Sequence, residues 1–345
     1  MIQISLKNKL SFICLSVMFF FGCMLEENSS SIIPDSIHLV SWNVQTFFDA
    51  TTTGTEYSEF IGSKSRWNQE LYLQRLDKLC QAITILDADI LVLQEIENQA
   101  VMYDIMNMLQ EHLHGDRIYK YMCFAAEKDA AIGCGVFSRL PLKNMTTHQL
   151  DSRLYGQQPQ LRPLLEVTVT ATVAGNNATS EYGVDLFKLM VCHWKSKSGG
   201  QEEAVLWQSQ QEKLLVSRLT QLENADGSLK IPAIICGDFN KDLSEFAKSN
   251  NCNCCVSMNG MLLKNGWLST FDPECCGSYW YQGKWEKIDH IFTLGELDME
   301  GFQAVKSQLW CCLDESGETI PFRYSVWQGA GFSDHLPVEC FISLQ

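Results

Sequence analysis

Six short apolar runs of this sequence each end in polar side chains, and this pattern most constrains the fold. Runs rich in valine, isoleucine and leucine are typical of buried strands. A charged or amide group where such a strand reaches the surface is costly unless it is paired or binds a ligand. Together, the oxygens and imidazoles indicate a site for a hard metal ion with a histidine acid/base group. The polar residues are Asn43, Glu95, His193, Asp238, Asn240, Asp289, Asp334 and His335.

Length and charge limit the classes of protein to which this chain can belong. With 345 residues and 46% hydrophobic content, the chain can bury the core of one large α/β domain or of two small ones. The formal net charge of -15 argues against tight, non-specific binding of nucleic acid or of an anionic membrane. It does not exclude turnover of a phosphoester, because a bound divalent ion supplies positive charge locally.

The apolar patterns predict sheets covered by outer helices. Strands are expected at residues 37–42, 90–93, 132–137, 164–173, 186–192, 231–236, 288–293 and 337–342. Helical spacing of apolar residues is seen at 66–86, 102–113 and 201–222. Because the polar strand ends come from both halves of the chain, the sheets must bring position 43 beside position 335. We therefore expect one integrated domain.

The N-terminus predicts a targeting segment. Lys7 and Lys9 precede an apolar stretch at residues 10–21, which is short for a membrane span, and Gly22 and Cys23 close it. This resembles a bacterial lipoprotein signal, with a signal peptide at 1–22, lipidation of Cys23 and a polar tether at 23–36. We expect an exported lipoprotein of the bacterial cell envelope, facing the periplasm or the surface and held on the membrane by its anchor. Simple secretion and an uncleaved anchor are the alternatives.

Fifteen cysteines are distributed unevenly. Cys80, Cys192 and Cys236 lie in apolar patterns and are expected to be small buried hydrophobes. In an exported protein, a dense cysteine cluster favours disulfides that pin a long loop region. Zinc is the weaker alternative, because only Cys252 and Cys255 have C-x₂-C spacing and no second such pair follows. The cluster consists of Cys252, Cys254, Cys255, Cys275, Cys276, Cys311 and Cys312.

The motifs also occur in the order of a known family. From about residue 37 to the C-terminus they read S-W-N, L-Q-E, G-V-F-S-R, C-H-W-K-S, G-D-F-N, I-D-H-I-F and S-D-H-L-P-V. This set resembles the endonuclease/exonuclease/phosphatase superfamily, which includes deoxyribonuclease I, abasic-site endonucleases, bacterial sphingomyelinases and inositol polyphosphate phosphatases. The resemblance implies an α/β fold, a four-layered sandwich of two packed mixed β-sheets flanked by helices. It would form a single domain at 37–345, with a cysteine-rich insertion at about 250–312.

The resemblance also implies the metal site. Asn43 and Glu95 match the family's metal-binding pair, and Asp334 would complete the shell. Oxygen ligands at strand ends suit Mg²⁺ or Mn²⁺, with Ca²⁺ as an accessory ion.

The catalytic roles carry over in the same way. Asp238 and Asn240 would orient the attacking water, and Asn240 would also help hold the phosphate. Asp289 and His335 resemble the family's paired carboxylate and imidazole, in which the carboxylate stabilises the protonated ring. His193 matches a phosphate-contacting histidine.

Arg162 would clamp the substrate phosphate, as a guanidinium binds phosphate oxygens in pairs. Arg139 and Arg153 compete with Arg162 for this role.

The implied activity is metal-dependent phosphoester hydrolysis by an activated water. No P-loop and no G-x-S-x-G motif is present in the sequence. We favour a nuclease-like phosphodiesterase acting on DNA or RNA, and expect a monomer. A sphingomyelinase-like phospholipid phosphodiesterase or a phosphatase is the alternative, and a surface binding protein without turnover is the second alternative. Trp280, Tyr281 and Trp285 would serve base stacking, lipid contact or simply the core.

Overall fold

Two large β-sheets form the centre of the structure, a computed structural model that describes residues 33–153, 156, 158–174, 181–249, 252–269 and 276–344. The six-stranded sheet has the order β15 (Leu297–Ala304), β18 (Val338–Leu344), β1 (Ile37–Phe47), β2 (Ile90–Ile96), β4 (Gly133–Ser138) and β3 (Tyr121–Ala125). The eight-stranded sheet has the order β5 (Leu142–His148), β6 (Leu164–Ala174), β7 (Glu181–His193), β8 (Ala233–Asp238), β14 (Asp289–Leu294), β11 (Met261–Asn265), β10 (Cys255–Met258) and β9 (Ala247–Lys248).

The inner faces of the two sheets pack against each other. Leu39 and Val92 of the first sheet share one buried cluster with Leu189 and Ile234 of the second. The strands at the centre, β1 with β2 and β7 with β8, pair in parallel. Because helices cover the outer faces as well, these strands are buried on both sides, which explains their continuous apolar runs.

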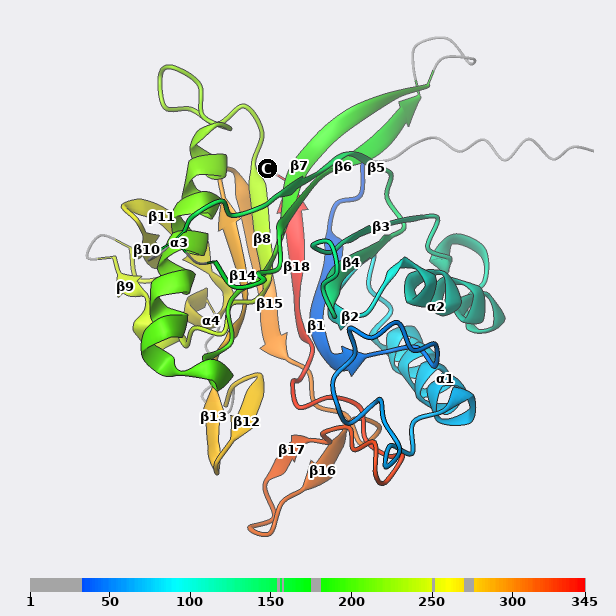
Figure 1. The fold of residues 1–345 in the computed structure, drawn as a ribbon. Helices are drawn as coiled ribbons and strands as arrows, with labels where there is room; N and C mark the ends of the chain where they lie inside the picture. Colours follow the sequence, from blue (N-terminus) through cyan, green and yellow to red (C-terminus); the bar gives the residue numbers. More distant parts are fainter. Residues whose placement is uncertain are drawn as a thin grey trace, which may run out of the picture. The chain divides into compact units, whose positions relative to one another are not determined.

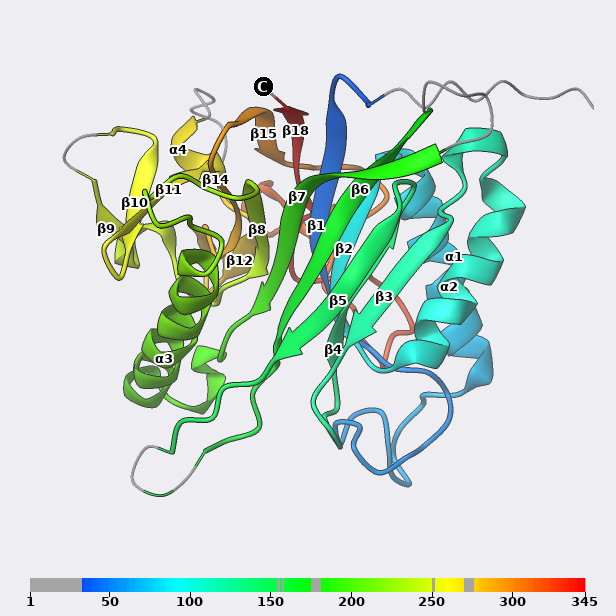
Figure 2. The ribbon, with the colours of Figure 1, turned by 90° about the horizontal axis from the view of Figure 1, so that it is seen from above.

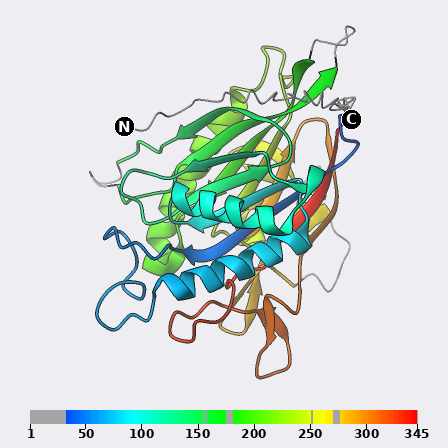
Figure 3. The ribbon, with the colours of Figure 1, turned by 90° about the vertical axis from the view of Figure 1, so that its right-hand side faces the viewer.

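Two helices, α1 (Gln69–Leu86) and α2 (Gln99–His112), cover the outer face of the first sheet and lie side by side (Figure 3). In α1, Leu76, Leu79 and Ile83 recur at helical spacing and are buried in one cluster with Trp42 of β1. The helix begins after Asn68, whose side chain accepts a hydrogen bond from the Leu71 N–H.

The third helix, α3 (Gln201–Thr220), covers the outer face of the second sheet. Leu215 and Leu219 pack there with Ile235 and Phe292. Figure 2 shows the resulting succession of α3, the two sheets, and α1 with α2. The predicted four-layered α/β sandwich is therefore confirmed.

Smaller elements connect these layers. Two hairpins, β12 (Tyr279–Tyr281) with β13 (Lys284–Glu286) and β16 (Cys311–Leu313) with β17 (Thr319–Pro321), extend from the sheets (Figure 1). The short helices are η1 (Gly115–Arg117), η2 (Lys197–Gly199), η3 (Leu243–Glu245) and α4 (Gly266–Ser269).

The cysteine-rich stretch at about 250–312 contributes strands to both sheets. Its described residues supply β10, β11 and β14 of the second sheet and β15 of the first. Cys252 and Cys255 form a disulfide, whereas Cys254, Cys311 and Cys312 are free. This bond closes a tight turn, and the free sulfurs of Cys254, Cys311 and Cys312 form no cross-link across a long loop. Cys275 lies outside the described residues.

The predictions for the N-terminus lie almost entirely outside the described residues, which begin at residue 33. These are the signal peptide, the lipidation of Cys23 and most of the tether. Among the helices that the structure describes, none has the length and apolar character needed to cross a bilayer. Cys80, Cys192 and Cys236 are buried, as predicted.

Candidate active site

Strand register places three of the predicted residues side by side at one edge of the second sheet. His193 of β7 pairs with Asp238 of β8 in the parallel ladder. Asp289 of β14 pairs with the same Asp238 in the antiparallel ladder. Gly237 makes this approach possible, since its φ is 132° and a Cβ there would lie 2.0 Å from the Cys192 carbonyl oxygen.

The first sheet brings Asn43 and Glu95 to the same place. Asn43 of β1 lies opposite Gln94 of β2, and Glu95 follows at a bulge where the register shifts between Gln94 and Ile96. The Asn43 amide donates to Glu95 Oε1 at 3.2 Å and to Asp238 Oδ2 at 3.0 Å. The Thr46 N–H donates to Glu95 Oε2 at 2.6 Å. The amide of Asn43 therefore joins residues of both sheets.

Asp238 is the centre of the arrangement and is only 1% exposed. Its Oδ1 accepts the Asn240 N–H at 2.8 Å. Its Oδ2 lies 3.6 Å from His193 Nε2 and 4.0 Å from His335 Nε2. Burial and then the negative charge of Asp289 raise the pKa of Asp238 to about 7. The carboxyl group can therefore gain or lose a proton near neutral pH.

Asp289 and His335 form a buried pair. Asp289 Oδ2 lies 2.7 Å from His335 Nδ1 and accepts the Ser278 hydroxyl at 2.6 Å. Burial alone would lower the pKa of His335, but Asp289 and then Asp238 raise it to about 10. The ring is therefore protonated at neutral pH.

His193 has the opposite electrostatics although it lies beside the same carboxylate. The ring is 2% exposed, and burial followed by the charge of Arg162 holds the pKa of His193 well below its usual range. Its Nδ1 has no hydrogen-bond partner among the described residues. The site thus holds one neutral and one protonated imidazole.

Arg162 lies in the same cleft. One of its amino groups donates to the Trp194 carbonyl oxygen at 2.7 Å, and its buried Nε has no hydrogen-bond partner in the described part of the chain. Arg139, a competing candidate, instead pairs with Asp87 and Asp89 away from the cleft. Arg162 therefore lines the cleft, whereas Arg139 does not.

Glu95, Arg162, His193, Asp238 and His335 line a cleft of about 700 Å³, and Asn43 and Asp289 support them from behind. Asp334 lies on its wall with Oδ2 3.9 Å from Arg323 Nε. The lining carries five cationic side chains, Arg162, Lys195, Lys197, Arg323 and protonated His335, and five carboxylates, Glu59, Glu95, Asp238, Glu286 and Asp334. Because the two charges nearly balance, an anion entering the cleft meets little net attraction from the protein alone.

Three tyrosines complete the wall, of which only Tyr281 was singled out from the sequence. Tyr57, Tyr279 and Tyr281 line the cleft, whereas Trp280 and Trp285 pair with ring centroids 5.1 Å apart. Side chains alternate along β12, so Tyr279 and Tyr281 lie on the same face of the strand. The Y-W-Y pattern therefore indicated that these two tyrosines lie together. Tyr57 lies in a loop, and no sequence pattern indicated that it would line the cleft.

Two groups of donors could hold a divalent ion. Asp238, Asp289 and His335 present donor atoms within 4.8 Å of one another. However, Asp289 Oδ2 is already engaged by His335 and by Ser278. Glu95 and Asp334 line the open cleft and offer carboxylate oxygens, the ligands that Mg²⁺ prefers. The residues present therefore fit a hard divalent ion.

Several solved structures share this fold at low sequence identity. TDP2 of Caenorhabditis elegans is 13% identical, with a TM-score of 0.54 over 89% of this chain and 74% of that chain. The human Nocturnin catalytic domain, solved with bound sulfate, is 18% identical, with a TM-score of 0.53 over 91% and 96%. A mannosyl-6-phosphatase of Bacteroides thetaiotaomicron is 16% identical, with a TM-score of 0.51 over 89% and 100%. Likeness at this identity establishes the fold.

No match was found among curated protein sequences. A family model described as Endonuclease/Exonuclease/phosphatase family matches residues 38–344. That match spans both sheets and every polar residue of the cleft, so the chain belongs to the endonuclease/exonuclease/phosphatase family.

Proposed function

We propose that this protein is a divalent-metal-dependent phosphodiesterase that hydrolyses nucleic acid with an activated water molecule. The main support is the position of Asp238, which lies between a neutral and a protonated imidazole at the base of the cleft. A carboxylate with a pKa of about 7 is suited to accept a proton from water near neutral pH.

The surrounding residues have distinct roles in this proposal. The substrate phosphate contacts Arg162, His193 and Asn240, and Asp238 removes the proton of the attacking water. Protonated His335, held by Asp289, faces the reacting group from the other side and offsets its growing negative charge.

Asn43, Glu95 and Asp334 would hold the metal ion. When bound, a divalent ion neutralises charge on the phosphoryl oxygens.

The cleft wall supports nucleic acid as the substrate. The rings of Tyr279 and Tyr281 are stacked, with centroids 6.0 Å apart and an interplanar angle of 14°. Parallel aromatic rings beside cationic side chains such as Lys195 and Arg323 match stacked bases joined by phosphates.

The alternative is a lipid substrate. Tyr281 is 48% exposed at the cleft and would contact a membrane surface. A lipid anchor at Cys23 would then hold the enzyme next to its substrate in the cell envelope. A phosphatase acting on a sugar phosphate is supported by the fold shared with the mannosyl-6-phosphatase.

The test is a panel of supercoiled DNA, sphingomyelin vesicles and a sugar phosphate, each with Mg²⁺ and with a chelator. We expect Mg²⁺-dependent nicking of DNA by the purified full chain, reduced about 10²- to 10⁴-fold in Asp238→Asn. Asp226→Asn, which changes a fully exposed turn aspartate, is the matched control. Hydrolysis of lipid or sugar phosphate without nicking would replace the proposed substrate, and no turnover of any of them would favour a binding protein.

A further inference from the structure

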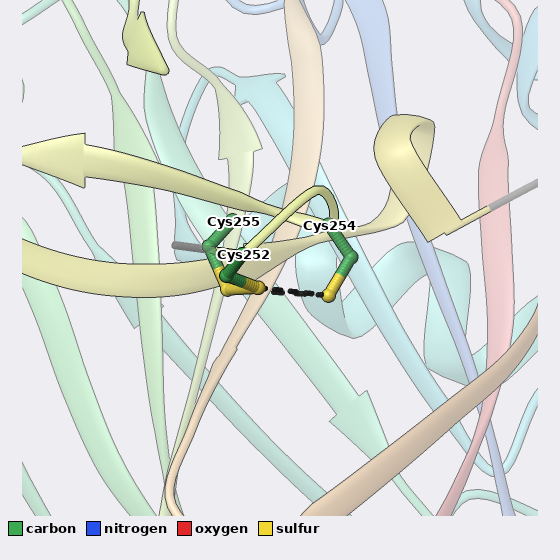
Figure 4. A group of neighbouring side chains, drawn as sticks. All are labelled: Cys252, Cys254 and Cys255. Carbon is green, nitrogen blue, oxygen red and sulfur yellow. Dashed lines mark hydrogen bonds between the residues drawn. A yellow bond between two sulfur atoms is a disulfide. The ribbon is translucent and has the colours of Figure 1, made fainter. Parts of the chain in front are cut away.

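Three cysteine sulfurs lie together where the chain turns into β10 (Figure 4). Cys252 and Cys255 form a disulfide, and Cys254 carries a free thiol. Cys254 Sγ lies 3.1 Å from Cys252 Sγ and 3.9 Å from Cys255 Sγ. A thiol is therefore in contact with a disulfide inside one four-residue segment.

The backbone holds the three residues in this arrangement. The Cys255 N–H donates to the Cys252 carbonyl oxygen at 3.3 Å, which closes the turn. The Asn265 N–H donates to the Cys254 carbonyl oxygen at 2.9 Å, which ties the turn to β11. None of the three cysteines lines the cleft described above.

Exposure differs between the sulfur-bearing residues. Cys252 and Cys254 are partly exposed, whereas Cys255 is 8% exposed and lies at the start of β10. A thiol at position 254 is thus open to solvent, and a thiol at position 255 is shielded.

We propose that the three cysteines form a thiol–disulfide exchange site in which Cys254 competes with Cys255 for Cys252. The Cys254 thiolate attacks Cys252 Sγ, and a Cys252–Cys254 bond forms as the Cys252–Cys255 bond breaks. The electron pair of the broken bond leaves on Cys255 Sγ, which takes up a proton. One disulfide and one thiol are present before and after, so no external oxidant or reductant is needed.

Proximity makes Cys252 the target sulfur. Exchange requires the thiolate to reach a disulfide sulfur, and Cys254 is closer to Cys252 than to Cys255. The exchange moves the free thiol from a partly exposed residue to a buried one. It would therefore switch access of external thiol-reactive molecules, such as a small disulfide, to this turn.

Differential alkylation of the full chain tests the proposal. The protein is held without reductant near pH 8, about the pKa of an ordinary thiol. It is then acidified and unfolded, so that exchange stops and a shielded thiol becomes accessible, and free thiols are blocked with excess N-ethylmaleimide. Disulfides are then reduced and labelled with iodoacetamide, and tandem mass spectrometry assigns each label. We expect maleimide on Cys254 in some molecules and on Cys255 in others.

Matched variants make the outcome specific. In Cys254→Ser, the maleimide label on Cys255 should be lost, because Cys252 and Cys255 remain joined. In Cys312→Ser, which removes a free cysteine of the β16 hairpin, the wild-type distribution should persist. Maleimide confined to Cys254 at all times, or present on all three cysteines, would overturn the proposal. A stoichiometric zinc ion that protects all three thiols would overturn it in favour of a metal site.

Discussion

Glu95 differs from the other carboxylates of the cleft in its backbone conformation. Its φ is 66°, in the left-handed region that costs a residue with a side chain on the order of 1–3 kcal/mol. Hydrogen bonds from the Thr46 N–H and the Asn43 amide hold the carboxylate in place. The bulge at Glu95 therefore aims a charged group into the cleft, where the proposed metal ion would bind.

The charge of Glu95 is the property to test. Glu95→Gln keeps the shape and an acceptor oxygen but removes the negative charge. Because a bound divalent ion contributes several kcal/mol to a phosphoryl-transfer transition state, we expect turnover to fall on the order of 10²-fold or more. Titration calorimetry with Mn²⁺ should show weakened binding in the same variant.

Glu59→Gln is the control, since Glu59 also lines the cleft but has no place in the proposed metal shell. Equal turnover and Mn²⁺ affinity in wild type and Glu95→Gln would remove Glu95 from that shell.

His335 makes stability depend on pH. Its pKa is about 10 in the folded chain and 6.5 for an ordinary histidine, so between these values the folded state holds a proton that the unfolded state has released. This stabilisation is complete below pH 6.5 and is lost as pH rises through about 10. The slope is at most about 1.4 kcal/mol per pH unit.

Asp289→Asn removes the main cause of the raised His335 pKa. Urea unfolding in chelator, at several pH values between about 7 and about 10, should show a steeper loss of stability in wild type than in Asp289→Asn. Parallel pH profiles would mean that Asp289 does not hold the proton on His335.

The backbone turn at residues 44–46, near the end of β1, is held by a buried arginine of α1. Arg75 is 3% exposed and donates to the carbonyl oxygens of Val44 and Thr46 at 3.0 Å each, and also to that of Gln45. It lies over the ring of Tyr324 at 3.8 Å. Gln45 and Thr46 both have positive φ, at 52° and 45°, and Arg75 satisfies the carbonyls that this turn exposes.

Arg75→Met should therefore destabilise the fold more than an ordinary arginine change. Burying two or more carbonyl groups without partners costs about 1–3 kcal/mol each, so we expect a loss of roughly 3 kcal/mol or more in the free energy of unfolding. Arg66→Met is the control, because Arg66 also donates to a backbone carbonyl, that of Trp327, but is exposed. Equal losses in urea titrations would show that the buried contacts of Arg75 do not hold the turn.

Central strands were predictable, whereas edge strands and long-range contacts were not. The runs at 90–93 and 231–236 lie in β2 and β8, which are buried on both faces and therefore uniformly apolar. In β15 only Leu297 and Phe302 are buried, so this edge strand carries no clear period.

The same distinction holds for the site. Asp238 and His193 each end an apolar run, so the sequence predicted both as site residues. Their contact depends on which strands pair and in which register, and the sequence does not show this. Arg75 gave no signal, because its partners are backbone carbonyls of another segment. Ser278, which donates to Asp289, was likewise hidden in a loop.

Across the whole molecule, the net charge of -15 opposes the approach of any polyanion. Whether this repulsion or the cleft's own cations dominate depends on ionic strength. At about 0.1 M salt, charges more than about 10 Å apart are largely screened, whereas direct contacts between cations and phosphates persist. Local contacts should therefore decide binding once a divalent ion is present.

The salt dependence of binding separates the two substrate classes. Lys197 pairs closely with Glu245, whereas the contact between Arg323 and Asp334 is looser, at 3.9 Å, and Asp334 would turn to the proposed metal ion. Arg162, Lys195 and Arg323 are therefore left to neutralise DNA phosphates. About three such contacts predict that apparent DNA affinity at saturating Mg²⁺ falls on the order of tenfold to a hundredfold between about 50 and about 200 mM salt. In Arg323→Gln, the slope of log affinity against log salt should decrease by about one. Hydrolysis of a neutral vesicle would change little over the same range, because apolar contact is not screened. A DNA slope near zero would mean that these cations do not contact the phosphates.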